Sequence, residues 1–400
     1  MPEELLLIPG PTMLTPRVRE VMARPQMGHV SAEFYEAFLE ILKLTKDVFY
    51  AKKGFPIVFT GPGTAAMEAS VVSLIEPGDK VLVPETGYFG RRFALINELH
   101  GAKVDVVKFE LGKHADAAVL ESRMRREKYK ALCLTHVDTS CGVANPMKEL
   151  VEIGRKNGVL TLVDAICSIG GCDLRFDDLG ADVVFAASQK ALAGPPGAAL
   201  MVLSEKAIEA MRKRRTRIPS YYFNLLRWKE VMENPKIYLA TPAVQVLLAL
   251  REALLIVKEE GLRNRWRRHQ LIAEGIRAGI SKLNLDFVAE EGYRADTVTA
   301  FWVKNGNASK LQKTMRQVHG VQIARGLFEN RDKMLRIGHF GNISPAQAAF
   351  ALNALEMSMK ALGYDARVGA AVEAAEPYFR ELRKPIPSPR RIAEGSRSNS

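Results

Sequence analysis

The stretch VLTLVDAICSIGGCDLRFDDLGADVVFAASQKALAGPPGAAL, residues 159–200, decides the fold. Two apolar runs in it, LTLVDA and DVVFAAS, are bounded by turn residues, which predicts two buried parallel strands. Asp164 closes the first run, and Ser188-Gln189-Lys190 closes the second. Because ligands of open α/β sheets bind just outside the carboxyl ends of the strands, we expect the carboxylate and the lysine to face one crevice.

Two interpretations of this pair are open from the stretch alone. Asp164 and Lys190 could form a buried ion pair, since both residue types are common at strand ends of α/β enzymes. They could also form a pyridoxal phosphate site, in which a lysine makes the Schiff base and a carboxylate partners the pyridinium nitrogen. The remainder of the chain has to distinguish the two.

The segments before this stretch repeat a strand–turn–helix plan, after a first amphipathic helix over residues 33–50. Apolar runs predict strands at 56–60, 80–83, 103–109 and 130–137, and helical periodicity predicts helices at 65–75, 90–100 and 147–157. Strands that alternate with helices from residue 55 to 203 predict an α/β fold with a mostly parallel sheet covered by helices.

The character of the chain changes after about residue 205. A long apolar helix is predicted over about 242–259, with Thr241-Pro242 as its N-cap and first residue. Alternating helices and short strands over 263–358 then predict a smaller α+β domain. We expect an N-terminal arm (1–30) that contributes to the small domain or to a dimer contact, a large domain (31–260), a small C-terminal domain (261–380) and a disordered basic tail (381–400).

Composition is that of a globular enzyme: 400 residues with 47% hydrophobic and 26% charged side chains. The net charge of +12 comes with short basic clusters outside any nucleic-acid module, so we expect solvated helix faces and no nucleic-acid partner. No apolar run approaches the roughly 20 residues of a membrane span, and no secretory signal is evident, which predicts a cytoplasmic protein. Four scattered cysteines predict neither a disulfide nor a metal site.

Two further features could serve a cofactor. Gly61-Pro62-Gly63-Thr64 lies between a predicted strand and a predicted helix, where unpaired N–H groups and the helix dipole suit a phosphate. An ordinary tight turn would look the same. Phe89 falls in a turn after a strand, where its ring could cover a flat ligand or simply join the core.

Eight motifs in order give a family pattern, and together they favour the pyridoxal interpretation. The chain resembles the class V aminotransferases of the fold-type I pyridoxal enzymes, and within them the alanine–glyoxylate/serine–pyruvate aminotransferase group. The resemblance covers about residues 5–360 and is carried by LLIPGPTMLTPRV, GPGTAAMEA, ETGYFGRR, THVDTSCGVANP, VDAICSIGG, SQKALAGPPG, YLATP and LRIGHFG. It implies a large domain with a seven-stranded type of sheet and a homodimer that shares its cofactor sites.

The resemblance also implies a role for each matching residue. Lys190 would hold pyridoxal 5′-phosphate as an aldimine, Asp164 would pair with the ring nitrogen, and Arg336 would bind the substrate carboxylate. The implied cofactor contacts are Ile166 and Phe89 on the two ring faces, Thr139 beside the cofactor, Gly63, Thr64 and Gln189 at the phosphate, and Tyr238 and Thr241 from the partner subunit.

One position departs from the family pattern. Many members have a Ser-Gly pair in the phosphate turn, and here Pro62 occupies the serine position. Proline has no backbone N–H and no hydroxyl. The phosphate would therefore depend more on Thr64, the helix end and the partner loop.

The resemblance implies a ping-pong transamination between a small amino acid, such as alanine or serine, and a small 2-oxo acid, such as glyoxylate or pyruvate. Aspartate or pyridoxamine as donor, and a lyase of the same fold, are the alternatives. A desulfurase is disfavoured because it needs a nucleophilic cysteine well beyond the lysine, and no cysteine follows Cys172. Arg217, Tyr221 and Tyr222 lie in a loop that could contact the substrate side chain.

Overall fold

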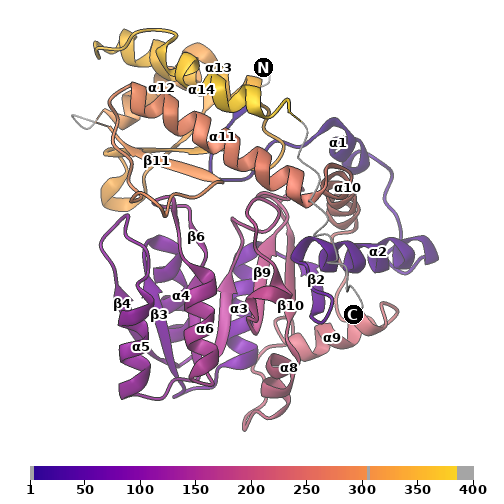
Figure 1. Cartoon of the computed structure of the whole chain (residues 1–400). Helices are drawn as coiled ribbons and strands as arrows, with labels where there is room; N and C mark the ends of the chain where they lie inside the picture. The colour runs from indigo at the N-terminus through magenta and orange to yellow at the C-terminus, as the bar shows by residue number, and fades with distance from the viewer. Residues whose placement is uncertain (1–3, 304–306, 385–400) are drawn as a thin grey trace, which may run out of the picture.

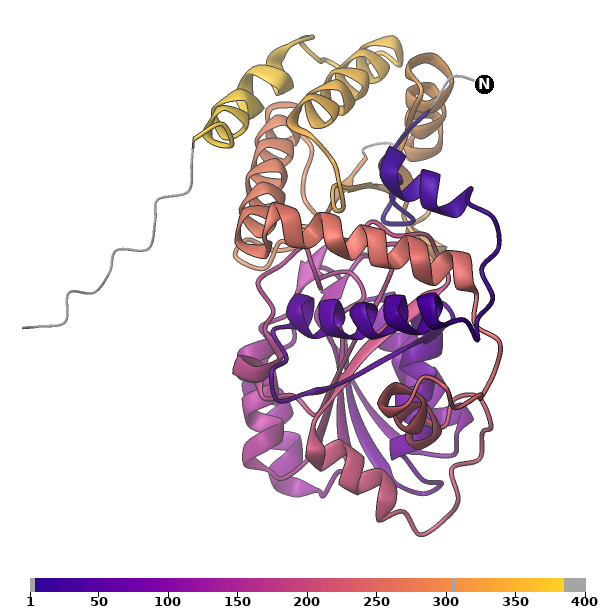
Figure 2. The same ribbon diagram turned by 90° about the vertical axis from the view of Figure 1, so that its right-hand side faces the viewer.

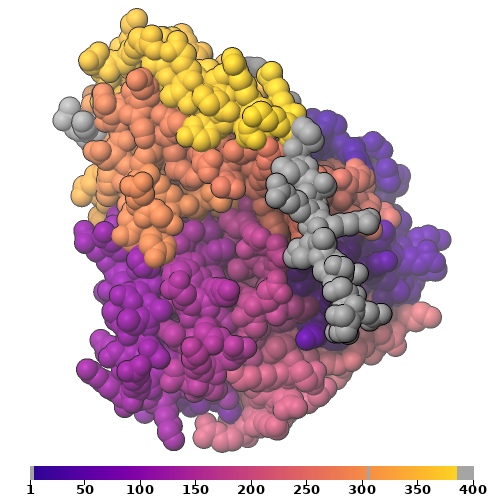
Figure 3. Space-filling view, viewed as in Figure 1, coloured from indigo at the N-terminus to yellow at the C-terminus, as the bar shows by residue number. Residues whose placement is uncertain are grey.

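The computed structural model describes residues 4–303 and 307–384. Figure 1 shows two parts: a large body built on one sheet, and a smaller one formed by the C-terminal elements together with the start of the chain. The same division is visible at the surface in Figure 3, where the segments after about residue 260 lie over the large body. The division at residues 30, 260 and 380 stays a prediction, and residues 385–400 of the expected tail lie outside the described residues.

The large body contains a seven-stranded sheet in which one strand, β10, runs antiparallel to both its neighbours. The predicted mostly parallel α/β fold is therefore confirmed. The strands lie in the order β2 (Phe55–Thr60), β10 (Ala198–Leu203), β9 (Val183–Ala187), β8 (Leu160–Asp164), β5 (Ala131–Thr135), β3 (Lys80–Glu85) and β4 (Lys103–Lys108).

The central strands are buried along their whole length because helices cover both faces of the sheet (Figure 2). All five residues of β8 and all five of β9 are buried. The helices of this body are α2 (Ala32–Phe49), α3 (Gly63–Leu74), α4 (Tyr88–Leu99), α5 (Ala117–Arg126), α6 (Met147–Lys156), α7 (Phe176–Leu179), α8 (Glu205–Arg212), α9 (Leu225–Glu233) and α10 (Val244–Glu260). A short hairpin, β6 (Val137–Asp138) with β7 (Val143–Ala144), follows β5.

The smaller body has its own hydrophobic core and a three-stranded antiparallel sheet in the order β11 (Val298–Trp302), β14 (Met334–Gly338) and β13 (Ala324–Arg325). Gly261 separates α10 from α11 with φ +78°, a value that favours glycine. The other elements of this body are α11 (Leu262–Lys282), α12 (Ala308–His319), β12 (Val321–Gln322), η2 (Phe328–Asn330), α13 (Pro345–Ala361) and α14 (Ala370–Glu381).

The N-terminal arm connects the two bodies. Its strand β1 (Leu5–Leu6) pairs in parallel with β12, and Leu7 is buried in the core of the smaller body. The next residues, Pro9 to Thr12, reach the loop after β9, and α1 (Pro16–Met22) then packs against α10. The arm therefore carries chain from the small sheet to the lysine at the end of β9.

Three local predictions differ from the structure. Helix α10 begins at Val244 after Ala243, so Thr241 does not cap it; the Thr241 hydroxyl bonds the Tyr238 hydroxyl instead. Helix α3 begins at Gly63 rather than at residue 65, and Phe89 lies in the first turn of α4 rather than in a loop. Among the described residues, no helix combines the length and apolar character that a membrane crossing requires.

Candidate active site

Asp164 is the last residue of β8 and only 4% of its surface is exposed. Its Oδ1 accepts a hydrogen bond from the Ile166 N–H at 3.0 Å. Burial raises the pKa of this carboxyl to about 7, an effect that the Ile166 N–H opposes and the Asp138 carboxylate reinforces. A carboxylate held in this way would be stabilised by a cationic partner in the crevice.

Lys190 lies in the loop after β9, the strand next to β8. Its Nζ donates a hydrogen bond to the Pro9 carbonyl and lies 5.8 Å from the centre of the Phe340 ring. A side chain at Gly10 would put its Cβ 2.5 Å from Lys190 Cδ, and Gly10 has φ +82°. The N-terminal arm therefore requires glycine here in order to approach the lysine.

The glycine turn before α3 packs directly against the Asp164 segment. A Cβ on Gly63 would lie 2.6 Å from Ile166 Cδ1, so only glycine allows the contact. Pro62 occupies the N-cap position and supplies no capping hydrogen bond from its side chain. The N-terminus of α3 thus retains donors and a positive dipole end for an anion.

Phe89 is held by a residue that sequence reasoning missed. Its backbone N–H donates to Asp138 Oδ2 at 2.9 Å, and Asp138 also accepts from the N–H of Ser140 at 3.0 Å. Asp138 is fully buried, which raises its pKa. It caps α4 from outside the helix and so fixes the aromatic residue at the site. An aspartate followed by serine two residues later is typical of an Asx turn, the one signal that could have indicated it.

Arg336 on β14 reaches from the small sheet to Thr139 of the large body, and the substrate and cofactor roles expected of these two residues stay predictions. Its Nη1 donates to the Thr139 carbonyl at 2.8 Å and its Nε to the Arg325 carbonyl at 2.9 Å. It is 7% exposed, and burial lowers its pKa. The two carbonyls orient the guanidinium, and Nη2 has no hydrogen-bond partner among the described residues, so it is available to a carboxylate.

Tyr238 and Thr241 are not brought to this crevice within one chain. Tyr238 is 65% exposed, and its ring lies 5.7 Å from that of His29 at the outer end of α2. The loop with Tyr221 lies beside it, since the Tyr221 hydroxyl donates to the Leu239 carbonyl at 3.3 Å. Arg217 lines a separate cavity of about 780 Å³ on the same loop. These four residues are exposed at the surface of the chain.

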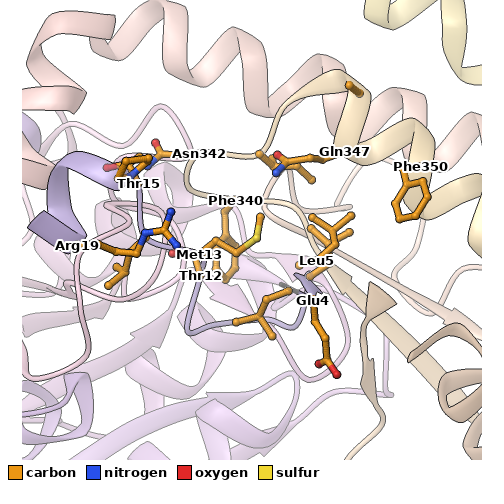
Figure 4. A pocket seen from close by; sticks show the side chains of 17 residues that line it. Glu4, Leu5, Thr12, Met13, Thr15, Arg19, Phe340, Asn342, Gln347 and Phe350 are labelled. Carbon is orange, nitrogen blue, oxygen red and sulfur yellow. The ribbon is translucent and has the colours of Figure 1, made fainter. Parts of the chain in front are cut away.

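A cavity of about 540 Å³ lies between the N-terminal arm and the start of α13, as Figure 4 shows. Thr12 and Phe340 line it, and the same two residues contact Lys190: the Thr12 hydroxyl donates to the Lys190 carbonyl at 3.4 Å. None of the residues predicted for the active site lines this cavity. It therefore borders the lysine loop without belonging to the Asp164 crevice.

The donor and acceptor groups of the crevice fit pyridoxal phosphate. Within the described residues, Asp164 Oδ2 has no hydrogen-bond donor, so it can receive the ring N–H⁺. The buried Oε1 of Gln189 also lacks a partner there, but a phosphate accepts hydrogen bonds, so the amide NH₂ would have to face it instead. The uncapped end of α3 suits the phosphate, and Lys190 is the amine of the site.

Comparisons with known proteins agree with this geometry. Residues 17–329 match the family model Aminotransferase class-V. An uncharacterised aminotransferase of Methanocaldococcus jannaschii is 34% identical over 381 residues, which are 95% of this chain and 98% of that protein. The alanine–glyoxylate aminotransferase of Callithrix jacchus is 33% identical over 346 residues, which are 85% of this chain and 84% of that protein.

Solved structures show the same likeness. The ureidoglycine–glyoxylate aminotransferase of Bacillus subtilis superimposes with a TM-score of 0.91 at 28% identity, covering 95% of this chain and 99% of that one. The pyridoxamine–pyruvate aminotransferase of Mesorhizobium loti gives a TM-score of 0.90 at 26% identity, covering 94% and 97%. Because the family model matches most of this chain, the chain belongs to the class-V aminotransferases, and membership of this family implies pyridoxal phosphate as the cofactor.

Proposed function

We propose that this aminotransferase uses pyridoxal phosphate to move an amino group between a small amino acid, alanine or serine, and a small 2-oxo acid, glyoxylate or pyruvate. One observation carries the proposal. Asp164, a buried carboxylate with a free oxygen, ends β8, and the amine Lys190 follows the adjacent strand β9, while Arg336 bonds the Thr139 carbonyl.

When bound, the cofactor supplies an electron sink for the bond to the substrate α-hydrogen. Asp164 would hold the proton on the ring nitrogen. Burial destabilises the charged form of this carboxyl, so a cationic partner is favourable. Phe89 and Ile166 would confine the ring between them. The end of α3, with Gly63 and Thr64, would anchor the phosphate and fix its position.

Lys190 would move the proton. Its Nζ would take the proton from the substrate α-carbon and deliver it to C4′ of the cofactor, on the other side of the amino nitrogen. The amino nitrogen would then stay with the cofactor, and water would supply the oxygen of the 2-oxo acid. The ε-amine has a defined resting contact on the Pro9 carbonyl. This hydrogen bond to the N-terminal arm would hold the Lys190 amine in place while the amine is not bonded to the cofactor.

Arg336 would select the α-carboxylate that amino acids and 2-oxo acids share. A guanidinium matches a carboxylate with two parallel hydrogen bonds, which a lysine cannot do. The choice of glyoxylate or pyruvate rests on relatives that are named for these acceptors. A pyridoxamine donor is the alternative, because one similar structure is that of a pyridoxamine–pyruvate aminotransferase.

A homodimer would complete the site. Tyr238 and Thr241 lie on an exposed loop, and the apolar side chains of Val30, Ile237 and Tyr238 are 64%, 42% and 65% exposed near one another around one shallow cavity. Such a surface favours a second copy, whose loop would reach the phosphate. The cytoplasmic location and the absence of a nucleic-acid partner stay predictions of the sequence.

The test is an absorbance spectrum of the purified protein with pyridoxal phosphate, recorded alone, after L-alanine and after glyoxylate. The proposal predicts a cofactor band that falls with alanine and returns with glyoxylate. A band that alanine leaves unchanged contradicts alanine as donor, and serine, aspartate and pyridoxamine are then tested in turn. A protein that binds no cofactor contradicts the whole proposal.

A further inference from the structure

The phosphate turn of this chain is short of hydrogen-bond donors. Pro62 has neither an N–H nor a hydroxyl and makes no side-chain capping hydrogen bond at the N-terminus of α3. The side-chain donor that remains in the turn itself is the hydroxyl of Thr64. How that hydroxyl is oriented therefore matters more here than in a turn that contains serine.

Arg92 determines the orientation of that hydroxyl. Its Nη1 donates a hydrogen bond to Thr64 Oγ1 at 3.2 Å. A guanidinium has only donors and stays protonated, so the Thr64 oxygen must be the acceptor. The hydroxyl hydrogen of Thr64 is then free to be donated to another oxygen, as a phosphate requires.

Arg92 also contacts the aromatic wall of the site. Its guanidinium carbon lies 4.9 Å from the centre of the Phe89 ring and 4.8 Å from that of Tyr88. Phe89 and Arg92 are three residues apart on α4 and so share one face of the helix. The half-buried guanidinium thus joins the start of α3 to the residue expected to cover the cofactor ring.

The positive charge of Arg92 acts on the carboxyl of Asp164. It is one of the charges that oppose the upward shift of the Asp164 pKa. The adjacent Arg91, by contrast, is exposed and lines a different cavity with Phe328. Two consecutive arginines therefore differ in whether they face the site.

We infer that Arg92 is a positioning residue for the cofactor phosphate, which keeps the Thr64 hydroxyl turned as a donor and adds a positive charge beside a turn in which Pro62 supplies neither an N–H nor a hydroxyl. The inference rests on the proposed function. The expected effect of Arg92 is on the binding of the phosphate, not on the binding of the cofactor ring or of the amino donor.

The test compares the binding of pyridoxal phosphate and of phosphate-free pyridoxal to the apoenzyme, followed by absorbance and by quenching of protein fluorescence. Arg92→Gln is expected to weaken pyridoxal phosphate roughly 10- to 100-fold, the range of a lost charge-assisted hydrogen bond. Pyridoxal affinity stays within about twofold, and Arg91→Gln, the matched control, leaves both unchanged. Adding Pro62→Ser to Arg92→Gln should recover part of the loss, because serine restores an N–H and a hydroxyl.

Equal loss of both ligands in Arg92→Gln would overturn the inference, since the arginine would then act through the ring wall or the fold. An unchanged affinity for pyridoxal phosphate would overturn it as well. Wild-type protein that binds neither ligand would instead contradict the proposed function. Unaltered pyridoxal binding in the variant shows that the site is folded. A loss of affinity for pyridoxal phosphate alone can then not be attributed to misfolding.

Discussion

Two buried carboxylates lie beyond or at the carboxyl ends of the neighbouring strands β5 and β8, and their hydrogen bonding differs. Asp138, in β6 after β5, accepts hydrogen bonds from the N–H groups of Phe89, Gly90 and Ser140 and from the Ser140 hydroxyl. Asp164, at the end of β8, accepts one, from the Ile166 N–H. Burial raises the pKa of both.

The difference shows how one fold gives the same side chain two tasks. Asp138 has its acceptor capacity used by the protein, so it organises backbone and has little left for a ligand. Asp164 is buried but left with a free oxygen, which costs stability until a cation arrives. An under-satisfied buried charge is therefore the better indicator of a functional site.

The largest expected effect is that of Asp164→Asn on the reaction. An amide cannot hold the proton on the ring nitrogen, so we expect kcat to fall by roughly 10³-fold while cofactor is still bound, the order seen when one preorganised electrostatic partner is lost. Steady-state rates with alanine and glyoxylate, with bound cofactor measured by absorbance, check this. A fall of less than tenfold would mean that Asp164 and Asp138 do not differ as described.

Arg336→Lys should weaken substrate binding without changing the Asp164 contact to the ring nitrogen. Lysine keeps the charge but loses the two-pronged geometry, so KM for the amino donor should rise by roughly 10²-fold, or about 2.7 kcal/mol, with a smaller change in kcat. Arg331→Lys, an exposed arginine in the loop before β14, is the control. A KM that stays at the wild-type value would remove Arg336 from the carboxylate site.

Asp138→Asn should act on stability first. The amide presents an NH₂ group where the carboxylate faces several N–H donors, and we expect a loss of about 2 kcal/mol in the free energy of unfolding. Urea denaturation measures it. Asp116→Asn is the matched control, because Asp116 caps the exposed start of α5 through a single bond from the Ala118 N–H at 2.7 Å. Equal losses in both variants would contradict a special role for Asp138.

The smallest effect is a pH dependence of the apoenzyme. The folded pKa of Asp164 is raised to about 7, so between pH 6 and pH 8 the folded state binds more protons than the unfolded state. Stability must then fall as pH rises, by about 1.4 kcal/mol over these two units. The difference between wild type and Asp164→Asn in urea denaturation at both pH values isolates this group, and a difference that does not change with pH would contradict the raised pKa.

Much of the fold was predictable because its pattern is local. Short continuous apolar runs between turn residues, such as LTLVDA, favour a strand covered on both faces, and the residues that end parallel strands of this kind lie at one edge of the sheet. Asp164 and Lys190 are predicted as site residues on this basis, and the structure places them at the end of β8 and after β9. The antiparallel direction of β10 was not, since an apolar run carries no information about direction.

What was missed depends on contacts between distant segments. Asp138 accepts a hydrogen bond from the N–H of Phe89, 49 residues away, and nothing in the sequence THVDTSCG predicts that partner. The expected N-cap at Thr241 was wrong because the Thr60 hydroxyl, brought in by the end of β2, accepts from the Ala243 N–H while Thr241 pairs with Tyr238. The roles of Tyr238 and Thr241 need a second chain and stay predictions.

The most direct test of the account identifies the lysine that is linked to the cofactor. The protein is loaded with pyridoxal phosphate, reduced with borohydride, digested with trypsin and analysed by mass spectrometry. We predict the adduct on Lys190, in a peptide that spans residues 176–206 because trypsin no longer cleaves at the modified lysine. An adduct on another lysine, or cleavage after an unmodified Lys190 in protein that carries cofactor, would contradict the placement of the active site between β8 and β9.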